Sequence, residues 1–296
     1  MRNARSYKLV GYVYVYPAVL YMLVLVGYPI VYNVLLSFQN VDMTNLTSGE
    51  HRFVGLSNYA DILSKEIFAT SLKNTLVYTV FSIIFQFSIG FALALFFQSK
   101  FKFASFLRGL MLVSWMSPIV VTALLFKFMF STGVGIINYL LLSAGWIDRP
   151  MEWLTDPGLA MAAVITANIW IGIPFNMILL AAGLSNLPQD IYESAGIDGA
   201  NRAQKFLYLT VPLLRPVMMV VMILGFIYTF KVFDLVYVMT GGGPVDATEV
   251  LSTLSYRYSF DQFQFSSGAT VSNILFLILL LISFLYLKMI RSDEVM

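Results

Sequence analysis

The polar segment at about 184–215 carries the most informative pattern of charged, small and helix-breaking residues in the chain. Pro188 suits the first turn of a helix, and the positive end of that helix's dipole favours the carboxylates of Asp190 and Glu193. Gly199 predicts the end of this short helix, because glycine tolerates the backbone conformation of a sharp turn. Small residues along the helix would let the backbone of another protein approach closely. The pattern therefore predicts a docking element.

A second short helix is predicted over 200–209, with Pro212 ending it before the next apolar segment. The whole segment, at about 30 residues, is too long and too patterned for a plain turn. The simpler alternative is a connecting loop in which its proline, glycine and carboxylates only cap helices.

Two opposite charges, Lys231 and Asp234, lie in another, strongly apolar part of the sequence. On one helix, a spacing of three residues places both on one face, where they can pair. Pairing matters because an unpaired charge within lipid is costly. We expect a structural ion pair or a gate, near the outer third of the membrane.

Patterns for catalysis and metal binding are missing from the sequence. The chain has no cysteine and a single histidine, His51, which leaves no thiolate site and no cluster of imidazoles. The run from Gly241 to Pro244 is rich in glycine but lacks the lysine of a phosphate-binding loop. We therefore expect no catalytic residue, no metal and no cofactor in this chain.

Composition places most of the chain in lipid. Of the 296 residues, 59% are hydrophobic and only 11% are charged, whereas soluble domains have about 25% charged residues. Six apolar segments have about the length needed to cross a hydrocarbon core: 10–36, 75–97, 108–130, 159–183, 216–239 and 268–290. The sequence predicts an all-α polytopic membrane protein with one domain, 1–296. The net charge of +2 argues against nucleic-acid binding.

The distribution of basic residues predicts the orientation. Eleven lie in the tails and loops on the side of both termini: Arg2, Arg5, Lys8, Lys100, Lys102, Arg108, Arg202, Lys205, Arg215, Lys288 and Arg291. Five lie in the opposite loops: Arg52, Lys65, Lys73, Arg149 and Arg257. Because lysine and arginine concentrate in cytoplasmic loops, we expect both termini and the 184–215 segment to be cytoplasmic.

The 184–215 segment resembles the Glu-Ala-Ala loop of ABC-importer permeases. That pattern is Glu-Ala-Ala, three residues, Gly, nine residues, Ile, one residue, Leu, Pro. The spacing is matched throughout by Glu193, Ser194, Ala195, Gly199, Leu209, Val211 and Pro212, of which Ser194, Leu209 and Val211 are substitutions. The stretches 230–260 and 170–177 are similar to carbohydrate-uptake permeases of the maltose and glycerol-phosphate type.

The resemblance implies a MetI-like permease of the cytoplasmic (inner) membrane that does no chemistry itself. Its expected partners are membrane lipid, a second permease in a heterodimer, a dimer of ATP-binding subunits that hold ATP and Mg, and an extracytoplasmic solute-binding protein. In this family the loop forms coupling helices in a groove of the ATPase. Glu193 would fix the loop by charge-assisted hydrogen bonds, Ala195 would pack, and Gly199 would permit the turn. Ser194, Asp198 and Pro212 complete the expected set.

A carbohydrate pathway is also implied by the resemblance, at Asn168, Ile171, Gly172, Phe175, Tyr228, Thr229 and Val232. Amides and hydroxyls suit sugar hydroxyls, and aromatic faces suit the C–H surfaces of the ring. The alternative is that such polar residues only hydrogen-bond a neighbouring helix, or that the partner permease alone holds the substrate.

Two other arrangements stay open from the sequence. A stand-alone secondary transporter or channel would also be polytopic, although an ion-driven carrier needs intramembrane carboxylates and only Asp234 qualifies. Within the importer class, a homodimer is the alternative to the expected heterodimer.

Overall fold

The computed structural model describes residues 14–49, 51–98 and 101–293. The chain forms two compact units. One contains the residues up to Lys65 together with Leu254–Phe276, and the other contains Glu66–Thr253 and the residues from Leu277. The start of the expected first span, residues 10–13, and the basic residues Arg2, Arg5, Lys8 and Lys100 lie outside the described residues. The prediction of an all-α membrane fold is confirmed.

The first unit begins with a helical run, Tyr14–Ser37. It contains a π-helical turn, η1 (Leu23–Gly27), and α2 (Tyr28–Ser37), followed by β1 (Gln39–Asn40), β2 (Arg52–Phe53) and α3 (Ser57–Ser64). The two short strands pair antiparallel. The unit also holds the end of α13 (Leu251–Tyr256), the π-helical turn η3 (Arg257–Asp261) and the first part of α14 (Phe265–Asp293).

Hydrogen bonds join the early and late segments of this unit. The amide of Asn33 donates to Asn273 Oδ1 (2.8 Å), and the backbone N–H of Val41 donates to Ser266 Oγ (2.8 Å). Polar pairs of this kind fix one helix against another inside lipid. The start of α14 is thereby held against the N-terminal part of the chain.

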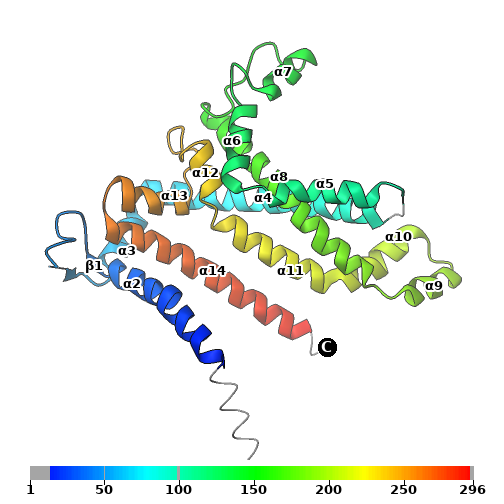
Figure 1. Cartoon of the computed structure of the whole chain (residues 1–296), viewed down its shortest axis with the longest axis horizontal. Coiled ribbons are helices and arrows are strands. Elements are labelled where there is room, and N and C mark those ends of the chain that lie inside the picture. The colour runs from blue at the N-terminus through cyan, green and yellow to red at the C-terminus, as the bar shows by residue number, and fades with distance from the viewer. Residues whose placement is uncertain (1–13, 50, 99–100, 294–296) are drawn as a thin grey trace, which may run out of the picture. The chain divides into compact units, whose positions relative to one another are not determined.

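The second unit contains most of the apolar helices. In chain order these are α4 (Glu66–Gln98), α5 (Ala104–Met116), α6 (Ile119–Met129), α7 (Ile136–Ser143), α8 (Pro157–Ser185), α9 (Gln189–Ile197), α10 (Arg202–Lys205), a π-helical turn η2 (Phe206–Thr210), α11 (Val211–Phe230) and α12 (Asp234–Met239). The two longest, α4 and α8, lie side by side (Figure 1). Small residues on the buried face of α4, such as Ser82 and Gly90, permit this close packing.

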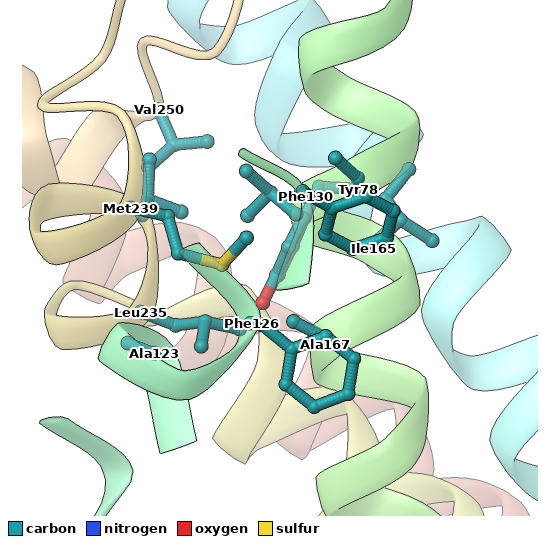
Figure 2. Close-up of a cluster of buried hydrophobic side chains, with 12 residues drawn as sticks. Tyr78, Ala123, Phe126, Phe130, Ile165, Ala167, Leu235, Met239 and Val250 are labelled. Carbon is teal, nitrogen blue, oxygen red and sulfur yellow. The ribbon is translucent and has the colours of Figure 1, made fainter. Parts of the chain in front are cut away.

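The core of the second unit forms where four helices meet. Figure 2 shows Leu235 and Met239 of α12 beside Phe126 of α6, with Ile165 of α8 and Tyr78 of α4 completing the cluster. The short helix α12 is therefore packed into this unit by its apolar side chains.

Within the described residues, five long helices and one bent pair match the expected six spans. The expected span at 108–130 is interrupted, because α5 and α6 meet at an angle of 96°. The bend falls at Ser117 and Pro118, where Ser117 has extended backbone. Proline disfavours helical geometry in the residue before it, and it lacks an N–H for the helix.

The prediction for the fifth span was wrong at both ends. One helical run extends from Arg202 to Phe230, and α12 is separate from it. Pro212 lies in the first turn of α11 and does not end a helix. The π-helical turn η2 ends two residues before this proline and shifts the hydrogen-bond register there, so the helix continues past a residue without an N–H.

Candidate functional site

A hollow of about 420 Å³ lies in the second unit. Nine residues selected from the sequence border it: Asn168, Ile171, Gly172, Phe175, Tyr228, Thr229, Lys231, Val232 and Asp234. They come from α8, from the end of α11, from the break that follows it and from the beginning of α12. The structure thus brings together two sets of residues that are far apart in the sequence.

Aromatic rings form one wall of the hollow. The rings of Phe175 and Tyr228 meet edge to face with centroids 6.1 Å apart, and Trp115 of α5 lies 5.9 Å from Phe175. Rings in this arrangement offer flat apolar faces and hold one another in place. Trp115 was not predicted as a site residue, although a tryptophan within an apolar segment was a visible signal.

Lys231 and Asp234 do not share a helix, contrary to the prediction. Lys231 directly follows the end of α11, whereas Asp234 is the first residue of α12. Both side chains are exposed, and within the described residues no ion pair joins them. Lys231 Nζ instead lies 5.6 Å from the centroid of the Tyr228 ring. The helix break separates the two charges, and both remain at the edge of the hollow.

The break itself is held by α13. The hydroxyl of Ser252 donates a hydrogen bond to the carbonyl of Val232, one of the backbone groups between α11 and α12. A carbonyl that has left a helix within the membrane needs such a partner. This hydrogen bond therefore stabilises the break between α11 and α12.

Other polar and small residues that the sequence analysis did not select as site residues also border the hollow: Gln86, Asn176 and Gly225. Asn176 donates its amide to the carbonyl of Gly172 (2.8 Å). A Cβ added to Gly225 would meet no atom within 4 Å, so this glycine faces open space. The signal for Gln86 was a polar residue within a long apolar segment.

The predicted coupling loop, residues 184–215, forms a second candidate site. Gly199 has φ of +79°, the left-handed conformation expected for the turn after α9. Asn201 then starts α10 with a capping box, in which Asn201 and Gln204 exchange side-chain to backbone hydrogen bonds of 2.9 and 2.8 Å. This cap was not predicted, although Asn201 and Gln204 have its spacing.

The anchoring of α9 differs from the expected one. Glu193 is exposed and takes no hydrogen bond from the described residues. The loop is held instead by Tyr192, whose hydroxyl donates to Thr210 Oγ1 (3.0 Å), and by Lys205, whose Nζ donates to the carbonyl of Tyr192 (2.9 Å). The carboxylate of Glu193 is thus free to meet another molecule.

Apolar side chains on the coupling loop are unusually open to solvent. Ile197 is 87% exposed and Tyr208 is 74% exposed. Ala195, Asp198 and Gly199 border a shallow hollow of about 320 Å³ beside Tyr208. Exposed apolar groups next to charged ones are typical of a protein-binding surface.

Replacing Tyr192 by phenylalanine is expected to loosen α9. The change removes only the hydroxyl that bonds Thr210, and a neutral hydrogen bond contributes about 1 kcal/mol. Amide hydrogen exchange in α9, measured by mass spectrometry, should accelerate about fivefold. The matched control is Tyr208→Phe, whose exposed hydroxyl has no partner within the described residues, and exchange there should not change. Equal exchange in both variants would remove Tyr192 from this role.

The chain matches the family of binding-protein-dependent transport system inner membrane components over residues 86–290, and it belongs to this family. The chain is a multi-pass inner-membrane protein and the non-catalytic permease subunit of an ABC importer. Such an importer works with a separate ATPase and a solute-binding protein. The stand-alone carrier or channel is thereby set aside.

Named relatives cover nearly the whole chain. The chain is 34% identical to the trehalose/maltose transport system permease protein MalF of Thermococcus litoralis, with 95% of this chain and 93% of that protein aligned. It is 33% identical to the lactose transport system permease protein LacF of Rhizobium radiobacter, with 98% and 97% aligned.

A solved structure has the same fold. The chain aligns with a subunit of a bacterial ABC transporter involved in the import of the acidic polysaccharide alginate. The TM-score is 0.83 at 22% identity, and the alignment covers 99% of both chains. The likeness extends over both compact units of this chain.

Proposed function

We propose that this chain forms part of the membrane path of a carbohydrate delivered by a solute-binding protein. The observation that carries the proposal is the composition of the hollow, which is bordered by the polar residues Asn168 and Thr229 together with the aromatic residues Phe175 and Tyr228. Sugars need hydrogen-bonding groups for their hydroxyls and flat apolar faces for their C–H surfaces. Relatives named for trehalose, maltose and lactose transport support this solute class.

The coupling loop is our proposed contact with the ATPase. Its contact residues would be Glu193, Ser194, Ala195, Asp198, Gly199 and Pro212. The carboxylate of Glu193 and the apolar surface near Ile197 offer a charged and an apolar contact close together. Movement of the closing ATPase would pass through this loop to α11 and change access to the hollow.

The proposal also includes the orientation of the chain, a second permease subunit and a role for two charged residues. Both termini are cytoplasmic in this proposal, because the coupling loop must meet the ATPase and the basic residues concentrate on the same side. A second, different permease subunit completes the path. Lys231 and Asp234 act at the edge of the hollow as charges of a gate.

Uptake into proteoliposomes tests the solute class. The complete importer, with its binding protein, would be offered radiolabelled maltose, trehalose and lactose in the presence of ATP. Accumulation of at least one of these sugars is the expected result. A complex that hydrolyses ATP with its binding protein but imports no sugar would refute the carbohydrate proposal.

Filling the hollow should stop import without stopping the ATPase. Gly225→Phe places a ring where a Cβ meets no atom within 4 Å. We expect sugar uptake to fall at least about tenfold, the equivalent of roughly 1.4 kcal/mol, while binding-protein-stimulated ATP hydrolysis continues. The control is Met222→Phe, which adds the same ring to an exposed position of α11 that does not border the hollow. Normal uptake by the Gly225 variant would place the path elsewhere.

A further inference from the structure

Gln86 is a buried polar residue in the middle of an apolar helix. It lies on α4, only 4% of its side chain is exposed, and it borders the hollow. Its Nε2 donates to the main-chain carbonyl of Asn168 on α8 (2.8 Å). A buried carboxamide in a membrane helix is costly unless its hydrogen-bonding groups are used.

The backbone of α8 is shaped to receive this side chain. Gly172 stands opposite Gln86, and a Cβ added there would overlap the carboxamide, 2.5 Å from Nε2. The absence of a side chain at Gly172 therefore lets the carboxamide lie against α8 at the wall of the hollow. This contact joins α4 to a site that the sequence assigned only to later helices.

Two hydrogen-bonding groups at this wall remain unused within the described residues. The single hydrogen bond of Gln86 leaves Oε1 without a donor. Asn168 Nδ2 is buried and has no partner. Oε1 is an acceptor and Nδ2 is a donor, and a buried donor such as Nδ2 normally has a partner. A hydroxyl group supplies both functions, since it donates one hydrogen bond and accepts others.

We propose that Gln86 and Asn168 together bind a hydroxyl of the passing solute, and that Gln86 is a specificity-determining residue of the path. The inference rests on the proposed carbohydrate function and adds a residue from α4 to it. A purely structural role would need only the bond from Nε2 to α8. A purely structural role would leave Gln86 Oε1 and Asn168 Nδ2 without hydrogen-bond partners.

Uptake of deoxy sugars distinguishes recognition of the solute by Gln86 from a purely structural role of Gln86. The complete importer would be tested with maltose, trehalose or lactose, whichever the wild type imports, in competition with monodeoxy derivatives of the same sugar. The wild type should prefer the parent sugar about tenfold over at least one derivative, as expected for one lost hydrogen bond. In Gln86→Leu that preference should fall below about twofold, and the KM for uptake should rise about tenfold.

Gln98→Leu is the matched control. Gln98 is the other glutamine of α4, it is exposed, and it does not border the hollow. Its variant should keep the wild-type preference. A Gln86→Leu importer with unchanged preference would overturn the inference about Gln86 and leave the carbohydrate function intact, whereas a wild type that imports no sugar would refute the function itself.

A third outcome is that the Gln86 variant does not assemble into the importer. If Gln86→Leu fails to assemble, Gln86→Asn keeps a carboxamide but shortens it by one methylene, and it should lose the same preference. Full preference in the asparagine variant, or failure of both variants to assemble, would assign Gln86 to helix packing and overturn the inference.

Discussion

Glu193→Lys is expected to remove the ATPase from the purified complex and to lower sugar uptake at least about 100-fold. The carboxylate is exposed and takes no hydrogen bond from the described residues, so its loss should leave the fold of the coupling loop intact. Reversal of a charge within a protein interface costs several kcal/mol, and about 2.7 kcal/mol corresponds to 100-fold in affinity. Affinity purification of the tagged chain, followed by mass spectrometry of its partners, measures the loss directly.

The control for this variant is Asp148→Lys. Asp148 is also exposed, and the change in charge is identical, but it follows α7, on the predicted opposite side of the membrane. Its complex should retain the ATPase. If both variants retained the ATPase in equal amounts, the coupling loop would lose its assigned contact.

Gly90→Leu should prevent the tight packing of α4 against α8. A Cβ at this position would lie 2.6 Å from Asn176 Cβ, 3.1 Å from the backbone nitrogen of Met177 and 3.2 Å from the carbonyl of Ile173. Two of these atoms belong to the backbone, so a change of side-chain rotamer cannot make room. Overpacking of this kind costs about 3 kcal/mol, which lowers the midpoint of thermal unfolding by roughly 6–12 °C.

Thermal unfolding of the detergent-solubilised complex measures this effect, and Gly109→Leu is its control. Gly109 lies in α5, where an added Cβ meets no atom within 4 Å. The control should unfold within about 2 °C of the wild type, because a surface change is worth less than about 0.5 kcal/mol. Equal midpoints for the two leucine variants would contradict the close packing at Gly90.

Hydropathy predicted the number of membrane segments but not their continuity. A window of apolar residues reports length and composition, and these are the same for a straight helix and for the bent pair α5 and α6. The proline at the bend, Pro118, was visible in the sequence. Pro212 was visible too and had the opposite outcome, since the π-helical turn before it lets the helix continue.

The sequence likewise predicted some of the site residues and not others. Residues implied by the family resemblance, such as Asn168 and Tyr228, could be selected before their position was known, and they do border one hollow. Their role in transport stays a prediction. Gln86 was visible as a polar residue in an apolar segment, but its place at the hollow was not, because it depends on the glycine opposite it, Gly172, 86 residues later in the sequence. The expected pairing of Lys231 with Asp234 failed because it assumed a helix across the break.

In the proposed function, the helical run from Arg202 to Phe230 would act as a lever arm. Its 29 residues span roughly 43 Å at 1.5 Å per residue. Its first third is tied to α9 through Lys205 and Thr210, and its other end carries Tyr228 and Thr229 at the hollow. A tilt of about 10° around its midpoint would move each end by roughly 4 Å. The π-helical turn and Pro216 interrupt the regular helical hydrogen bonds near the coupling loop. The regular part of the helix extends from there to the hollow, so a small movement of the coupling loop would displace Tyr228 and Thr229.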